Sequence, residues 1–203
     1  MIVKEACIGS VEAGVEAAIR GADRLEVCEH LEIGGTTPSE AYLKAVIESV
    51  KIPCVAIIRP RGGNFVYDEK EFEQMLVEIE RCCKMGVYGI AIGILTPDGE
   101  VDVARMRQVM DVSCGLSVTF HMAFDETRDM KKALEELIAL NVHRILTKGG
   151  ALNAPNGVRV LSELVGLSQN RIIIMPGGGV TKDNYQEIVR ITNATEVHGT
   201  KIV

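Results

Sequence analysis

The stretch DEKEFEQMLVEIERCCKMG, residues 68–86, decides how this chain folds, and an apolar run that begins at Tyr88 follows it directly. Asp68 and Glu71, three positions apart, form the pattern of a capping box, which begins a helix. Gly86 is typical of the position just beyond a helix end. The apolar residues between these signals recur at helical spacing and form one stripe: Phe72, Met75, Leu76, Ile79, Cys82 and Cys83. We therefore predict a helix within residues 68–86 that packs on a sheet.

The alternation of strand and helix continues along the chain on both sides of this stretch. Short apolar runs of strand length begin near Ile2, Arg24, Ile52, Tyr88, Leu116, Arg144, Arg171 and Thr195. Signals typical of helix starts lie between them, at Ser10, Ser39, Asp68, Asp102, Thr127–Asp129 and Thr181. Eight such units without a linker favour a single α/β domain over residues 1–203, a (β/α)8 TIM-type barrel. A doubly wound sheet is disfavoured because it usually has about five or six strands and one dominant glycine-rich fingerprint.

The chain stops at Val203, just past the eighth predicted strand. Barrels of this type typically have about 250 residues, and each strand is followed by a helix. We therefore expect the barrel to lack its final helix. Two explanations are open at this point: the chain is truncated, or a partner subunit covers the gap between the first and seventh helices.

Composition excludes several classes of protein. The net charge of −6 disfavours a nucleic-acid binder. No apolar run approaches the ~18 residues of a membrane helix. The apolar N-terminal segment contains the acidic residue Glu5 and is not preceded by the basic residues of a signal peptide. We therefore expect no signal peptide and a cytoplasmic location. The six cysteines form no CxxC pattern, and we expect free thiols.

Ionisable residues gather where the predicted strands end. Residues two apart on a strand share a face, and this parity pairs Glu5 with Cys7, Glu26 with Cys28, Thr119 with His121, and Glu196 with His198. Arg59 and Arg61 end the third strand, and Asp125 follows the fifth. One such residue alone is usually a solvated loop residue, but together they indicate a site at the C-terminal mouth, where barrels bind their ligands.

Two kinds of ligand are compatible with this mouth. Cys7 and Cys28 end neighbouring strands with the same parity, and paired thiolates with a nearby His or Met suit Cu(I). Buried cysteine is also a common packing residue, so both interpretations stay open. Gly177 and Gly178 follow the seventh strand, where barrels often bind phosphate, although such loops also need glycine simply to turn. We interpret the other four cysteines as packing residues.

Longer motifs surround these residues. They include Glu5-Ala6-Cys7, Arg24-Leu25-Glu26-Val27-Cys28, Arg59-Pro60-Arg61-Gly62-Gly63, His121-Met122-Ala123-Phe124-Asp125 and Glu196-Val197-His198. As a set that spans nearly the whole chain, they resemble the CutC family of copper homeostasis proteins. The resemblance implies a (β/α)8 barrel, a cytoplasmic location, a homodimer or higher homo-oligomer, and a role in copper handling.

The chain departs from the family pattern in two places. Met122 stands where the family usually has arginine, which removes a cation from the mouth and adds a thioether that suits a soft metal. The early end at Val203 is the other departure, because relatives commonly continue through a final helix. Oligomer contacts made by that helix cannot be transferred to this chain.

Two functional hypotheses follow, with a third in which activity resides in an oligomer surface that the sequence does not identify. In the first, the protein binds Cu(I) through Cys7 and Cys28, with His121 or Met122 as a further ligand. In the second, it is an enzyme for a small anionic metabolite. The residues of this second site are Arg59, Arg61, Glu196, His198, Gly177 and Gly178 for binding, His121 with Asp125 as an acid/base pair, and Glu5 or Glu26 as base or cation ligand.

Overall fold

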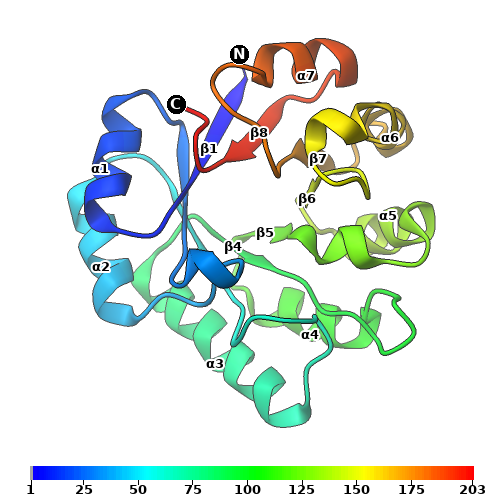
Figure 1. The fold of residues 1–203 in the computed structure, drawn as a ribbon. Helices are drawn as coiled ribbons and strands as arrows, with labels where there is room; N and C mark the ends of the chain where they lie inside the picture. The colour runs from blue at the N-terminus through cyan, green and yellow to red at the C-terminus, as the bar shows by residue number, and fades with distance from the viewer. Residues whose placement is uncertain (1) are drawn as a thin grey trace.

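Eight parallel strands form a ring in the computed structural model, which describes residues 2–203 (Figure 1). The hydrogen-bonded order is β7-β6-β5-β4-β3-β2-β1-β8, and β7 lies beside β8, so the ring is nearly closed. The strands are β1 Val3–Ile8, β2 Arg24–Val27, β3 Cys54–Ile57, β4 Gly89–Ile92, β5 Ser117–Phe120, β6 Arg144–Thr147, β7 Ile173–Pro176 and β8 Glu196–Gly199. The predicted (β/α)8 barrel is confirmed.

Seven α-helices surround the strands within residues 2–203, and α1 and α7 flank the side of the ring where both termini lie (Figure 1). They are α1 Val11–Ile19, α2 Glu40–Ser49, α3 Glu69–Met85, α4 Val103–Val112, α5 Met130–Ala139, α6 Ala154–Ser168 and α7 Tyr185–Thr192. Two short 3-10 helices, η1 Leu31–Ile33 and η2 Met122–Glu126, lie over the mouth of the barrel. Among these described helices, none is long and apolar enough to cross a membrane.

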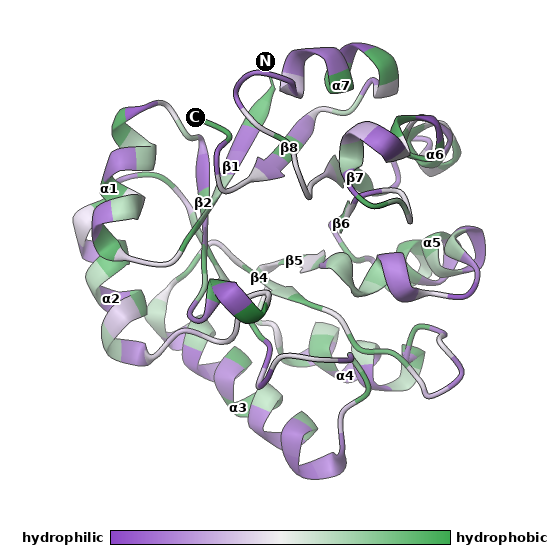
Figure 2. Ribbon diagram, viewed as in Figure 1, coloured by the Kyte–Doolittle hydropathy of each residue, from purple (hydrophilic) through white to green (hydrophobic). Residues whose placement is uncertain are grey.

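The helix that the sequence predicted best is α3. Asp68 accepts a hydrogen bond from the backbone N–H of Glu71, and the Glu71 carboxylate accepts one from the backbone N–H of Asp68. Gly86 ends the helix in the left-handed conformation, with φ +71°. In Figure 2, α3 alternates hydrophilic and hydrophobic residues along its turns, as expected for a helix packed on a sheet.

One predicted helix start was wrong. The last helix begins at Tyr185 with Asn184 at its cap, rather than at Thr181. Thr181 instead forms a β-bridge with Lys201, which lies beyond β8. A contact between segments so far apart in sequence overrides the local signal.

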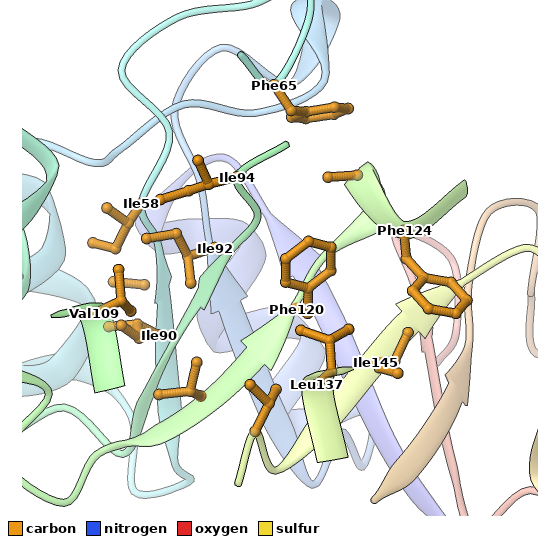
Figure 3. Close-up of a cluster of buried hydrophobic side chains, with 14 of the residues drawn as sticks. Ile58, Phe65, Ile90, Ile92, Ile94, Val109, Phe120, Phe124, Leu137 and Ile145 are labelled. Atoms are coloured by element: carbon orange, nitrogen blue, oxygen red, sulfur yellow. The ribbon is translucent and has the colours of Figure 1, made fainter. Parts of the chain in front are cut away.

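The main core lies between the strands and the helices (Figure 3). Ile90, Ile92 and Phe120 project from β4 and β5, and Val109 and Leu137 project from α4 and α5 to meet them. All five are fully buried, and each such side chain stabilises the fold by about 1.5–3 kcal/mol. The apolar core therefore lies outside the ring of strands, whereas charged residues such as Glu5, Arg24 and Glu196 are buried inside it.

Candidate functional site

Two thiols meet at the mouth of the barrel. Cys7 lies on β1 and Cys28 follows β2, and these neighbouring strands are paired so that Cys7 lies opposite Glu26. The Cys7 Sγ and Cys28 Sγ atoms are 3.7 Å apart. All six cysteines are free, as predicted, and the expected approach of Cys7 and Cys28 is observed.

A carboxylate and an imidazole complete what we call the thiol cluster: Cys7, Glu26, Cys28 and His198. The Cys28 thiol donates to Glu26 Oε2 at 3.4 Å, and His198 Nε2 lies 3.7 Å from the same oxygen. Potential ligand atoms of Cys7, Glu26 and His198 all lie within 4.8 Å of one another. Three neighbouring strands, β8, β1 and β2, therefore bring three potential metal ligands together, and the Cys28 thiol contacts two of them, Cys7 and Glu26.

Below this cluster the barrel interior holds what we call the charged layer: Glu5, Arg24, Arg144 and Glu196. Arg24 forms ion pairs with both Glu5 and Glu196. Arg144 Nε donates to Glu196 Oε2 at 3.1 Å, and Arg144 Nη1 donates to Ser117 Oγ at 2.6 Å. Each buried charge in this layer therefore faces an opposite charge, which offsets the cost of removing it from water.

Glu5 connects the charged layer to the thiol cluster. Its Oε1 lies 2.9 Å from His198 Nδ1. Burial alone would raise the pKa of Glu5, but the hydrogen bond from His198 and the charge of Arg24 lower it to about 2. Burial likewise opposes the charged form of His198, but the acidic groups around it, Glu26 first, raise its pKa well above the usual value. Glu5 is therefore ionised, and its contact with His198 favours the protonated form of that imidazole.

Opposite pKa shifts separate the remaining ionisable groups of the thiol cluster. The hydrogen-bond contact with Cys28 and the neighbouring His198 lower the pKa of Cys7 well below its usual value, against the effect of burial. The same contact, together with burial, raises the pKa of Cys28 well above its usual value. Burial first, and then the negative charges of Cys7 and Glu5, raise the pKa of Glu26 to about 8. The cluster therefore favours a thiolate at Cys7 beside a protonated thiol at Cys28.

The opposite side of the mouth carries hydrogen-bond donors. His121 follows β5, and its Nδ1 accepts a hydrogen bond of 3.2 Å from the backbone N–H of Ala123, where η2 begins. Its Nε2 is buried and has no partner in the described chain. Burial and the nearby charge of Arg59 lower the pKa of His121 to about 3. The ring is therefore neutral, and with Nδ1 as the acceptor its proton lies on Nε2.

Arg59 lies near His121 at the end of β3. Its Nη1 donates to the carbonyl oxygens of Ile33 and Gly35, each at 3.0 Å, and its Nη2 donates to that of Gly63 at 2.9 Å. The guanidinium lies 5.0 Å from the Phe65 ring, and the His121 ring lies 5.0 Å from the same ring. We call Arg59, Phe65 and His121 the donor wall.

A cavity of about 220 Å³ separates the thiol cluster from the donor wall. Apolar side chains such as Leu31, Ile57 and Leu146 fill the rest of its lining. The predicted residues that line it are Cys7, Glu26, Cys28, Arg59, His121, Met122 and His198. Gly177 lies directly against this cavity, since a Cβ atom there would come within 3.3 Å of His198 and 3.2 Å of Met122. The mouth of the barrel thus holds most of the candidate residues, as the strand parity predicts.

Arg61, Glu196 and Gly178 lie outside this arrangement. Arg61 turns away from the mouth and pairs with Glu71 on α3. Glu196 belongs to the charged layer and is already paired with two arginines. Gly178 follows β7 with φ +78°, beside Met122 and the side chain of Lys148. None of the three is among the residues that line the cavity in residues 2–203.

The structure does not bring His121 and Asp125 together as an acid/base pair. Asp125 accepts hydrogen bonds from Thr147 Oγ1 at 2.7 Å and from the backbone N–H of Gly150 at 2.7 Å. Its carboxylate therefore fixes the loop after β6. Both residues follow β5, but η2 begins directly after His121 and redirects the chain.

The sequence interpretation did not include Arg24, Arg144 and Phe65 in the site. Arg24 shares the parity of Glu26 on β2, so the same rule that identified Glu26 could have found it. Arg144 begins β6 and projects into the interior in the same way. Phe65 follows a glycine-rich loop, and no local pattern indicates that it contacts both Arg59 and His121.

Comparisons with known proteins agree on one family. The model of the CutC family matches residues 2–203. A human protein, "Copper homeostasis protein cutC homolog", is 43% identical over 194 residues, which cover 96% of this chain and 71% of that protein. A CutC family protein of Parabacteroides distasonis is 46% identical over 195 residues, covering 96% of this chain and 80% of that protein.

Solved structures give the same result for the fold. A crystal structure of CutC from Streptococcus agalactiae matches with a TM-score of 0.94 at 36% identity, covering 100% of both chains. The aldolase QR15 matches with a TM-score of 0.71 at 13% identity, covering 98% of this chain and 89% of that one, which shows the fold alone. With the family model matching residues 2–203 and relatives at 43% and 46% identity, this chain belongs to the CutC family.

Proposed function

We propose that this protein binds Cu(I) in copper homeostasis, through the thiol sulfurs of Cys7 and Cys28. The observation that carries the proposal is the separation of 3.7 Å between these two sulfurs at one wall of the mouth cavity. Two metal–sulfur bonds of about 2.3 Å each, the length known for zinc thiolates, reach across that separation. Soft thiolate ligands select Cu(I) among biological metals.

His198 is the third ligand in this proposal. Its Nδ1 lies 2.9 Å from Glu5, so the imidazole can donate there and turn Nε2 toward the thiols. A carboxylate that orients a ligating histidine in this way is a common outer partner in metal sites. Because the pKa values of His198 and Cys28 are both raised, Cu(I) competes with a proton at each of these two ligands.

The expected role of His121 as a copper ligand has less support than that of His198. Its Nδ1 accepts from Ala123, which leaves the proton on Nε2 and no free lone pair for a metal. Met122 lines the cavity and stays a candidate thioether ligand.

The family supports the same function. The human relative and others are named copper homeostasis proteins or CutC homologues. In this chain the two cysteines occupy the cavity at the C-terminal mouth, where barrels of this fold hold their sites. Copper binding is thus proposed on the donor set and on the family name together.

An anaerobic competition titration of Cu(I) against a chromogenic chelator tests the proposal. We expect tight binding of one Cu(I) by the reduced protein and loss of that binding in the Cys7→Ser/Cys28→Ser double variant. The matched control is Cys114→Ser, which removes an exposed thiol away from the cavity. Weak binding by the unmodified protein, or equal binding by the double variant and the control, would contradict the proposal.

The alternative function is an enzyme that acts on a small anionic metabolite at the same mouth. Arg59 and His121 favour it, since both residues line the cavity and each has a buried N–H group without a partner in the described chain. Glu26, with its raised pKa, is the acid/base group best placed for this role. Glu5 is paired with Arg24 and His198, and Asp125 accepts hydrogen bonds from backbone N–H groups. Neither carboxylate is therefore free to act as a base.

Other expectations stay predictions. They are a cytoplasmic location, a homodimer or higher homo-oligomer, and the folding of residues 1–203 as a single domain. Size-exclusion chromatography with light scattering measures the number of subunits directly.

A further inference from the structure

Arg59 is a buried cation that has no carboxylate partner among residues 2–203. Its side chain is 5% exposed, and its hydrogen bonds go to the backbone carbonyls of Ile33, Gly35 and Gly63. Carbonyl oxygens satisfy N–H groups but carry no net charge. In the charged layer, by contrast, Arg24 and Arg144 face Glu5 and Glu196. The mouth therefore holds one positive charge that the described protein does not balance.

Arg59 also has one side-chain N–H group without an acceptor in the described chain. Its Nε is buried and makes no hydrogen bond within the described chain. An unpaired buried donor costs about 1–3 kcal/mol. A ligand that accepts from Nε would recover this cost and balance the charge.

His121 supplies a second donor of the same kind at the same cavity. Its Nδ1 is occupied as an acceptor by the backbone N–H of Ala123, so the neutral ring carries its proton on Nε2. Nε2 is buried without a partner among residues 2–203. The Phe65 ring lies 5.0 Å from both Arg59 and His121 and holds the two donors against one surface.

We propose that the donor wall of Arg59, Phe65 and His121 is a binding site for a small carboxylate, and that this site acts independently of copper. Two unpaired N–H groups, one of them on a cation, match the two oxygens of a carboxylate. A phosphate has more oxygens than this wall has free donors. The apolar side chains of Leu31 and Leu146 also line the cavity, which favours a carboxylate with a short carbon chain.

The cavity limits the size of this ligand. Its volume of about 220 Å³ corresponds to about seven water molecules at the ~30 Å³ that each occupies in the liquid. Acetate and pyruvate fit within this volume.

Isothermal titration of the reduced, copper-free protein with acetate, pyruvate and inorganic phosphate tests the proposal. The clean variant is His121→Asn, because the Asn side-chain oxygen can replace Nδ1 as the acceptor for Ala123 while the Nε2 donor is lost. We expect His121→Asn to bind acetate and pyruvate about 10-fold more weakly or worse, since one charge-assisted hydrogen bond is removed. Arg61→Gln is the matched control, because Arg61 pairs with Glu71 outside the cavity.

Other results separate this proposal from copper binding. His121→Asn should keep the Cu(I) affinity of the unmodified protein, and Cys7→Ser/Cys28→Ser should keep the carboxylate affinity. The carboxylate site would be overturned by an absence of acetate and pyruvate binding at millimolar concentration. Equal loss in His121→Asn and Arg61→Gln, loss in the double cysteine variant, or tighter binding of phosphate would overturn it as well.

Discussion

Glu5 and Glu26 are both carboxyl groups buried in the barrel interior on adjacent strands, yet their pKa values shift in opposite directions. Glu5 has Arg24 and His198 within hydrogen-bond reach, and its pKa falls to about 2. Glu26 has His198 at 3.7 Å and the negative groups of Cys7 and Glu5 nearby, and burial raises its pKa to about 8. The hydrogen bond from His198 and the charge of Arg24 therefore keep Glu5 ionised, whereas burial dominates at Glu26.

Replacing Glu26 by Gln should stabilise the protein at alkaline pH. The pKa of Glu26 is raised from 4.5 to about 8 by folding. Its contribution to stability is therefore fully present below pH 4.5 and is lost as pH rises through about 8. We expect the melting temperature of Glu26→Gln to exceed that of the unmodified protein by a few degrees at pH 9 and to match it near pH 4.5. Thermal unfolding across this range measures the difference, and a gain that does not change with pH would contradict the assignment.

Sequence patterns located these residues but not their partners. Parity along a strand places Glu5, Cys7, Glu26 and Cys28 in the interior, because it depends only on neighbours two positions apart. The contact between His198 and Glu5 joins residues 193 positions apart. Only the closed barrel brings His198 Nδ1 and Glu5 Oε1 within 2.9 Å, so neither this contact nor the pKa shifts that it causes could be predicted from the sequence.

At the scale of single elements, α3 has the most complete local signals. Asp68, Glu71 and Gly86 each satisfy a backbone group at its ends, as predicted. Local sequence sufficed here because every partner lies within a few residues. It failed for α7, whose start depends on the long-range bridge between Thr181 and Lys201.

Removing the cap of α3 should destabilise the whole protein by about 1 kcal/mol. The Asp68→Ala variant leaves the backbone N–H of Glu71 without its side-chain acceptor, and such changes typically cost about 0.5–2 kcal/mol. Urea unfolding followed by circular dichroism measures the free energy of unfolding. Glu73→Ala, an exposed position on the same helix, is the control and should change stability by less than about 0.5 kcal/mol. Equal effects of the two variants would argue against the cap.

At the scale of the whole molecule, the charged layer connects strands from both ends of the chain. Glu5 on β1, Arg24 on β2, Arg144 on β6 and Glu196 on β8 form one continuous network. Hydrophobic periodicity predicts the barrel around it, since each βα unit repeats a local pattern. The network itself has no such pattern, because its partners lie up to 172 residues apart.

The Arg24→Met variant should have a much lower free energy of unfolding than the unmodified protein. It removes the cation between two buried carboxylates and leaves both without that partner, a change that typically costs about 3–5 kcal/mol. Denaturant unfolding at pH 7 measures the loss. Arg20→Met is the matched control, because Arg20 forms an exposed pair with Glu16 on α1 and should cost less than about 1 kcal/mol. A loss of similar size in both variants would show that the charged layer does not hold the barrel together.

The central claim is that Cys7 and Cys28 bind one Cu(I) between them, and X-ray absorption spectroscopy of the anaerobic Cu(I)-loaded protein tests it most directly. The account predicts two sulfur neighbours for each copper, at about 2.3 Å, with one nitrogen neighbour that disappears in a His198→Ala variant. A copper environment of only nitrogen and oxygen neighbours would contradict it. So would a sulfur signal that persists in the Cys7→Ser/Cys28→Ser variant.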